Sequence, residues 1–146
     1  MNVSAKKEYA CLAVLELAGA YELDEPLQLR RIASKHGIPN PFLVQILLQL
    51  KAAGIVESTR GATGGYRLSA SPDELTLGAV VSVVDSSGNR GSGATANSRQ
   101  SPSPALQVLH ETWDEVERAQ RGILESITLA DLVARARGRT ENMYYI

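Results

Sequence analysis

The sequence of 146 residues contains one cysteine and no long apolar run, and both absences exclude whole classes of protein. The single cysteine, Cys11, excludes an intramolecular disulfide and a metal site built from several cysteines of one chain. No apolar stretch approaches the roughly 18 residues that a transmembrane helix needs, and the N-terminal residues lack the apolar core of a secretory signal. We therefore expect a cytoplasmic protein that does not enter a membrane and that folds without covalent staples.

A strong overall charge is also absent, since the formal net charge is −1 at pH 7, but the basic residues are unevenly distributed. The window 26–67 holds one acidic residue, Glu57, and six basic residues: Arg30, Arg31, Lys35, Lys51, Arg60 and Arg67. Such a window is typical of a protein with one cationic face, for which nucleic acid is a common partner. The alternative is a set of charges scattered over a solvated surface.

The N-terminal half shows the periodicity of three helices. Apolar residues recur at three- and four-residue steps over about 4–20, 28–36 and 41–53. Ser4 is the expected N-cap of the first helix, and Gly37 ends the second. Asn40 is expected to cap the third helix, with Pro41 at its first helical position.

Two short strands, 55–59 and 66–69, follow the third helix and are joined by the loop Arg60-Gly-Ala-Thr-Gly-Gly65. Glycines allow positive backbone angles in such a loop and a close approach to another surface. A further helix is expected over about 76–85, with Thr76 as its N-cap. This order of helices followed by a glycine-tipped hairpin predicts a winged helix-turn-helix, in which the hairpin is the wing.

The C-terminal half combines a polar segment with a heptad pattern. Residues 86–104 contain no large apolar side chain, which predicts a flexible Ser/Gly-rich linker. Thr128 and Asp131 resemble a capping box that opens a last short helix ending at Gly138. Between these segments, an a/d seam predicts a long helix that pairs with a second copy of the chain, the alternative being an intramolecular core. The seam consists of Leu106, Leu109, Trp113, Val116, Ile123 and Ile127.

The expected fold is therefore mainly α with a small β wing, in four parts. Residues 1–85 form a winged helix-turn-helix DNA-binding domain, 86–104 a linker, 105–138 the dimerisation helix and the final short helix, and 139–146 a C-terminal tail. In such a domain the third helix enters the major groove of double-stranded DNA, and the wing reaches the backbone or the minor groove. Arg60, at the base of the wing, is the expected cation for a narrow minor groove or a phosphate.

Several motifs resemble the Rrf2 family of bacterial transcription regulators. They are the segments 4–10, 32–33, 37–38, 47–56 and 127–132 and, most specifically, the wing Arg60-Gly-Ala-Thr-Gly-Gly-Tyr66. The resemblance covers nearly the whole chain apart from the linker. It implies a homodimeric regulator, here expected to be a repressor, with a winged-helix domain and a long dimerisation helix.

The expected DNA-binding residues combine this resemblance with the sequence pattern. They are Lys6, Tyr9, Pro39, Asn40, Pro41, Phe42, Val44, Gln45, Lys51, Arg60, Gly64 and Gly65. Two positions depart from the family. Val44 replaces an acid of several members, so its side chain could contact a thymine methyl group but could not accept a hydrogen bond from cytosine. Glu8 stands where many members have a basic residue, which removes one expected phosphate contact.

The resemblance also bears on cofactors, because many Rrf2 proteins hold an iron–sulfur cluster through three cysteines between the fourth helix and the long helix. That segment has no cysteine here. His110 and Glu8 match positions that supply a further ligand in some members, but one histidine and one carboxylate cannot hold a cluster. We expect no cofactor and no metal, with Cys11 as a small core residue and His110 on the polar face of the long helix.

A branch of the family lacks the cysteines altogether, and it regulates cysteine metabolism through a complex with cysteine synthase. It shares a short aromatic tail that closes with isoleucine, which resembles Met143, Tyr144, Tyr145 and Ile146. The resemblance implies that this tail binds cysteine synthase, with an aliphatic side chain and a carboxylate as the anchoring groups. The alternative is that the tail packs on its own chain or frays.

Enzyme chemistry finds little support. The loop 61–65 lacks the Lys-Ser/Thr of a phosphate-binding loop, and no Ser/His/Asp set is suggested, so we do not expect an enzyme. Two alternatives to the cysteine-linked repressor remain. One is a regulator of the same family that senses an unknown ligand or an iron–sulfur cluster. The other is an interaction module that has lost DNA binding, which Val44 and Glu8 motivate.

Overall fold

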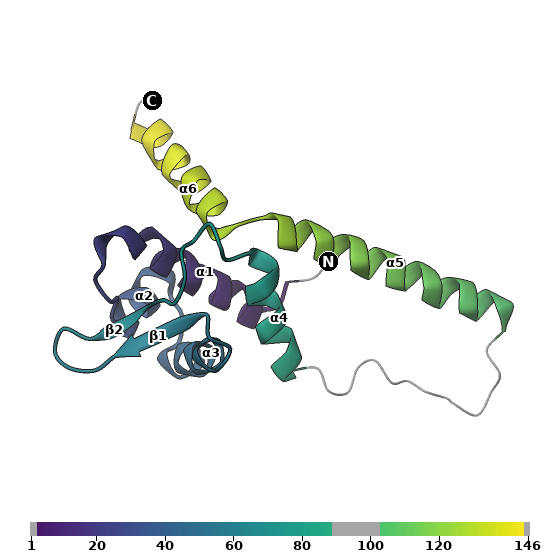
Figure 1. The fold of residues 1–146 in the computed structure, drawn as a ribbon, viewed down its shortest axis with the longest axis horizontal. Coiled ribbons are helices and arrows are strands. Elements are labelled where there is room, and N and C mark those ends of the chain that lie inside the picture. Colours follow the sequence, from purple (N-terminus) through teal and green to yellow (C-terminus); the bar gives the residue numbers. More distant parts are fainter. Residues whose placement is uncertain (1–2, 89–102, 145–146) are drawn as a thin grey trace.

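The computed structural model describes residues 3–88 and 103–144, with side chains described for 3–85 and 103–140. Figure 1 shows a body formed by α1, α2, α3, α4 and a two-stranded hairpin, from which α5 and α6 extend in different directions. The prediction of a mainly α fold with a small β wing is confirmed. In the described part of the chain, no helix is long and apolar enough to span a bilayer.

The first three helices form the expected helix-turn-helix. In α1 (Ala5–Gly19) the Ser4 hydroxyl accepts the N–H of Lys7 at 3.2 Å, so the predicted cap is confirmed. A 3-10 turn, η1 (Tyr21–Leu23), leads to α2 (Leu29–His36). Gly37 ends α2 with φ of 65°, a left-handed conformation that favours glycine. This turn directs the chain into α3 (Asn40–Ala52).

The expected start of α3 is wrong by one residue. Asn40 is the first helical residue, Pro39 occupies the N-cap position, and no side chain caps the helix. Pro41 thus lies in the second helical position, where its missing N–H still costs no intrahelical bond. Asn40 itself is exposed on the first turn of the helix.

The wing is an antiparallel pair of β1 (Val56–Thr59) and β2 (Gly65–Leu68), in register from Val56 opposite Leu68 to Thr59 opposite Gly65. A third segment supports it. Leu27 exchanges both backbone hydrogen bonds with Tyr66, at 2.9 and 2.8 Å. The wing is therefore attached to the chain that precedes α2, as well as to α3.

The α5–α6 junction is anchored on the start of α4 (Leu77–Gly88). Leu77 donates to the carbonyl of Ile127 at 2.8 Å, and Leu129 donates to that of Leu75 at 2.9 Å. Gly78 lets α5 (Pro104–Ser126) approach α4, since a Cβ there would lie 3.0 Å from the backbone nitrogen of Glu125. The fixed junction sets the directions in which α5 and α6 (Leu129–Tyr144) leave the body.

Both predicted caps near this junction are confirmed. Thr76 accepts the N–H of Ala79 at 3.1 Å. Thr128 and Asp131 form a reciprocal capping box, each backbone N–H donating to the other side chain at 3.1 Å. The hydrogen bonds from Thr128, backbone first, hold the pKa of the Asp131 carboxyl below its ordinary value.

Three expected boundaries differ from the structure. The last helix was expected to end at Gly138, but α6 continues to Tyr144, because one glycine costs a helix only about 1 kcal/mol. The expected linker 86–104 is also shorter at both ends, since α4 reaches Gly88 and α5 begins at Pro104. Residues 89–102, on which the flexible-linker prediction falls, lie outside the described residues.

The core is one apolar cluster contributed by α1, α2, α3, α4 and the wing, together with Leu129 from the start of α6. Among the described residues, no polar or charged side chain is buried. Full burial of one large aliphatic side chain stabilises a fold by about 1.5–3 kcal/mol. The inward stripe of α3 is Leu43, Ile46, Leu47 and Leu50, which fixes the opposite side of this helix as its outer face.

Candidate nucleic-acid interface

The outer face of α3 begins at the helix-turn-helix turn and is solvent-exposed along its first turns. Asn40, Pro41, Phe42, Val44 and Gln45 are all exposed there. Pro39 is exposed immediately before them. The side chains that the sequence places at the start of the third helix are thus available to a ligand, as base-reading residues of a recognition helix must be.

An aromatic pair connects α1 to this face. The rings of Tyr9 and Phe42 meet edge to face, with centroids 6.1 Å apart and planes at 78°. Such pairs contribute about 0.5–1.5 kcal/mol beyond their buried area, so the contact helps to fix the start of α3 against α1. Lys6 lies one turn before Tyr9 on α1 and is half-buried.

The wing lies beside the C-terminal half of α3. Lys51 of α3 donates to the hydroxyl of Ser58 in β1 at 2.7 Å. Arg60 is exposed at the residue that follows β1. The structure therefore places Lys51 beside Ser58 of β1, which lies two residues before Arg60 along the wing.

The structure shows why glycine is needed at two of the predicted DNA-contact residues, Gly64 and Gly65. Gly64 is buried, and a Cβ there would overlap with the carbonyl oxygen of Thr59. Gly65 is half-buried, and a Cβ there would overlap with the backbone of Leu27. Both glycines are thus required for the wing to close and to seat on the body. Their contact with DNA stays a prediction.

Folding pairs part of the basic window with Glu57, its own acidic residue, and with two acids that precede it in the sequence, Asp24 and Glu16. Arg67 contacts Asp24 at 2.6 Å and Glu57 at 3.3 Å. Lys35 contacts Glu16 at 2.9 Å. In the described residues no carboxylate lies within ion-pair distance of Arg30, Arg31 or Arg60.

Sequence reasoning missed the two arginines of α2 as site residues, although both belong to the basic window. Arg30 and Arg31 are exposed and line an open groove that also includes Asn40 at the start of α3. Gln28, just before α2, donates to the carbonyl of Ala62 in the wing loop at 3.5 Å. The signal that could have identified these site residues is the pair of adjacent arginines in the helix before the helix-turn-helix turn. We call Arg30, Arg31, Lys51 and Arg60 together the cationic face: the first two line the groove at the start of α3, and the last two lie at the end of α3 and after β1.

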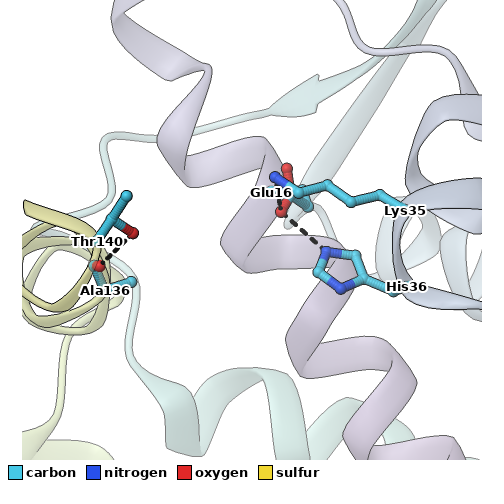
Figure 2. A network of polar contacts seen from close by, with 5 residues as sticks. All are labelled: Glu16, Lys35, His36, Ala136 and Thr140. Carbon is cyan, nitrogen blue, oxygen red and sulfur yellow. Dashed lines mark hydrogen bonds and ion pairs between the residues drawn. The ribbon is translucent and has the colours of Figure 1, made fainter. Parts of the chain in front are cut away.

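A polar network fixes the end of α2 against α1. Figure 2 shows Lys35 and His36, the last residues of α2, converging on the carboxylate of Glu16 in α1, with Ala136 and Thr140 of α6 nearby. The His36 Nε2 lies 2.8 Å from Glu16 Oε1. Burial acts to raise the pKa of Glu16, but hydrogen bonds and charge from Lys35 and His36 outweigh it and hold the pKa below its ordinary value. The network determines where α2, and hence the turn into α3, lies.

Replacing Glu16 by glutamine is expected to lower the free energy of unfolding at pH 7 by about 0.5–1 kcal/mol, a modest loss because solvent screens the largely exposed Lys35. A lowered folded-state pKa gives stability that is present above the unfolded pKa and lost as the pH falls through the folded pKa. The difference between wild type and variant should therefore shrink below about pH 4.5, the ordinary pKa of a glutamate. Urea unfolding at several pH values measures it, with Glu22→Gln on the exposed η1 turn as the control. Identical unfolding midpoints for wild type and Glu16→Gln at pH 7 would contradict this role.

Most of α5 projects away from the body (Figure 1). Every described residue from Ser103 to Ala119 is exposed, including Trp113 at 59% and the other apolar residues of the seam in this range. Gln120 and Leu124 become half-buried where α5 meets α4, and Ile127 is half-buried at the junction. The alternative of an intramolecular core is therefore wrong for the residues from Leu106 to Val116 and for Ile123, which the body leaves uncovered.

Comparison with known proteins identifies the family to which this architecture belongs. The family model Rrf2, described as "Iron-dependent Transcriptional regulator", matches residues 3–135. The chain belongs to the Rrf2 family. It is 32% identical over 147 residues to the HTH-type transcriptional regulator CymR of Bacillus subtilis, covering 100% of both chains. It is also 32% identical to the regulator IscR of Aliivibrio salmonicida, over 91% of this chain and 77% of that one.

Solved structures of Rrf2 regulators agree with the sequence relatives. The structure of T. potens IscR matches with a TM-score of 0.75 and 31% identity, covering 93% of this chain and 88% of that one. The structure of B. subtilis CymR matches with a TM-score of 0.74 and 30% identity, covering 92% and 98%. This Rrf2 protein is thus a transcription regulator with a winged-helix fold, and it is not an enzyme.

The donor set of this Rrf2 chain does not fit an iron–sulfur cluster, despite the iron in the family description. Clusters need several thiolates, and the chain has one cysteine. Burial, followed by the charge of Glu8, raises the pKa of the Cys11 thiol, which disfavours the thiolate. His110 is exposed on α5, and no group of three His, Cys, Asp or Glu side chains within the described residues could hold a metal ion.

Proposed function

We propose that this Rrf2 protein is a homodimeric repressor that binds double-stranded DNA through α3 and the wing. The observation that carries the proposal is the cationic face, formed by Arg30, Arg31, Lys51 and Arg60, beside the exposed outer face of α3. The face offers cations for phosphates, and α3 offers polar and apolar side chains for base edges. Lys6 and Tyr9, on α1, add contacts to the DNA backbone.

In this proposal the protein is a dimer, because the described chain leaves the apolar seam of α5 uncovered. Apolar side chains at a and d positions that the body does not cover are buried by a second copy of the same helix. A two-fold dimer presents two α3 helices to two half-sites, one or more helical turns apart, at roughly 34 Å per turn.

Hydroxyl-radical footprinting on fragments of the neighbouring promoters tests the proposal. It should show two protected half-sites related by two-fold symmetry, with the spacing expected for a dimer. Protection of a single unsymmetrical site, or of none, would argue for the alternative of an interaction module that has lost DNA binding.

We also propose that the effector is cysteine synthase, which binds the tail. Two observations support this finer assignment. The chain aligns over its full length with CymR, and the solved CymR is described as the global cysteine regulator of B. subtilis. The chain also lacks the thiolates of a cluster sensor. Tyr145 and Ile146 lie outside the described residues, and the backbones of Met143 and Tyr144 belong to the last turn of α6.

Deleting residues 144–146 is expected to abolish co-purification with cysteine synthase, because the proposed anchor lies in these residues. A pull-down with purified cysteine synthase from the native organism measures the effect. Thr140→Ala, one turn earlier on α6, is the matched control and should bind normally. The deletion should leave DNA binding unchanged in the absence of cysteine synthase. Retained binding by the deletion variant, or no binding by the wild type, would show that another signal controls the regulator.

A further inference from the structure

The outer face of α3 carries an apolar stripe that the fold does not use. Pro41, Val44 and Leu48 follow one another at three- and four-residue steps, so they lie on one side of the helix, with Gln45 among them. Val44 is 39% exposed and Leu48 is 55% exposed. Phe42, which is 46% exposed, flanks the stripe and is held by its ring contact with Tyr9. A contiguous exposed apolar stripe indicates a surface that something covers.

The charges around the stripe indicate what covers it. Arg30 and Arg31 lie on α2, across the turn, while Lys51 and Arg60 lie at the far end of α3 and in the wing. Arg30, Arg31 and Arg60 have no carboxylate partner in the described part of the chain. An apolar stripe between cations fits a polyanion that displays apolar groups between its phosphates. The major groove of DNA does so at each thymine, through the C5 methyl group.

The composition of the outer face limits which bases it can read. No acidic side chain lies on α3, so the carboxylate that usually accepts a hydrogen bond from the amino group of cytosine is missing there. No arginine lies on α3 either, and its single lysine, Lys51, is in the last turn and bonded to Ser58. The usual guanine contact is therefore missing from the reading end of the helix. Asn40 and Gln45 are the exposed uncharged polar side chains of α3, and both types pair with the N6 and N7 atoms of adenine.

We propose that α3 reads A·T pairs, with Val44 and Leu48 contacting thymine methyl groups and Gln45 hydrogen-bonding adenine. This inference rests on the proposed DNA-binding function and adds the class of sequence that the regulator selects. Its half-sites carry A·T pairs where α3 meets the groove. Specificity at those positions comes from the burial of methyl groups as well as from hydrogen bonds.

Replacing thymine by deoxyuridine tests the proposal, because it removes the C5 methyl group and keeps the pairing and the O4 acceptor. Duplexes are first selected from a random pool by the full-length wild-type protein. Each thymine of one half-site is then replaced in turn, and the affinity is measured by fluorescence anisotropy. At one or two positions the replacement should weaken binding about four-fold per methyl group, the factor that burial of one methyl carries.

Three variants connect the effect to its residues. Val44→Ala and Leu48→Ala should each bind the thymine duplex more weakly, and each should lose its sensitivity to deoxyuridine at one position. Val44→Glu should shift the selected sequence toward cytosine at that position, because a carboxylate accepts from the cytosine amino group. Both side chains are exposed, so circular dichroism melts of all variants should match the wild type.

The outcomes separate this inference from the function on which it rests. Equal affinity for thymine and deoxyuridine duplexes, or selection of G·C-rich half-sites, would overturn the thymine readout while leaving a salt-sensitive DNA-binding protein. Failure to select any sequence, with no salt-sensitive binding, would overturn the DNA-binding function itself. In that case the stripe would instead bind an apolar protein surface, and the proposal would be wrong.

Discussion

Replacing Leu109 by aspartate is expected to convert the proposed dimer into monomers and to weaken operator binding by about 10²–10⁴-fold, because two linked half-site contacts become one. Leu109 is 46% exposed on the α5 seam, next to Trp113. A carboxylate there would have to be desolvated opposite an apolar partner helix. Sedimentation equilibrium measures the first effect, and a gel shift on a two-half-site fragment measures the second.

Gln107→Asp is the matched control for this experiment, since it adds the same charge two residues away on the other side of α5. It should remain dimeric and bind DNA normally. The body of Leu109→Asp should keep its thermal unfolding, because α5 does not contribute to the core up to that residue. A dimeric Leu109→Asp variant, or a monomeric wild type, would contradict the role of the seam.

Replacing Arg60 by alanine is expected to weaken binding to all DNA sequences by about ten-fold or more in a dimer, since each subunit loses one cation facing phosphate or the minor groove. The slope of log K against log salt concentration should become shallower by about one unit per subunit. Arg60 is exposed and makes no ion pair in the described structure, so the fold should not suffer.

Arg118→Ala is the control for charge alone, because Arg118 is exposed on α5, away from the cationic face. Its salt slope should equal that of the wild type. If Arg60→Ala and Arg118→Ala give the same slope as the wild type, the wing does not contact DNA.

Local signals predicted the fold well. The caps at Ser4 and Thr76 and the box of Thr128 with Asp131 are decided by residues within four positions of each other, and the structure has all three. The glycine-tipped hairpin is local in the same sense. The end of α6 differs from the prediction because a single glycine, Gly138, does not stop this helix.

Which cations of the site stay unpaired could not be predicted from the basic window 26–67 alone. Asp24 and Glu16 precede the window in the sequence, and only folding brings them to Arg67 and Lys35. The need for glycine at position 65 is likewise visible only in the fold, because a Cβ there would overlap with the backbone of Leu27, far away in the sequence. The sequence thus indicated a basic region, whereas the structure determines which cations are left for a ligand.

The central claim, that this Rrf2 regulator binds DNA through one cationic face, is tested most directly by the salt dependence of wild-type binding. The affinity for a selected duplex should be measured between about 50 and about 200 mM KCl. Four cations per subunit in a dimer predict a linear fall of log K with log salt concentration, with a slope of about −7 if each cation neutralises one phosphate. Binding that does not change over this range, or no binding to any duplex, would contradict the account.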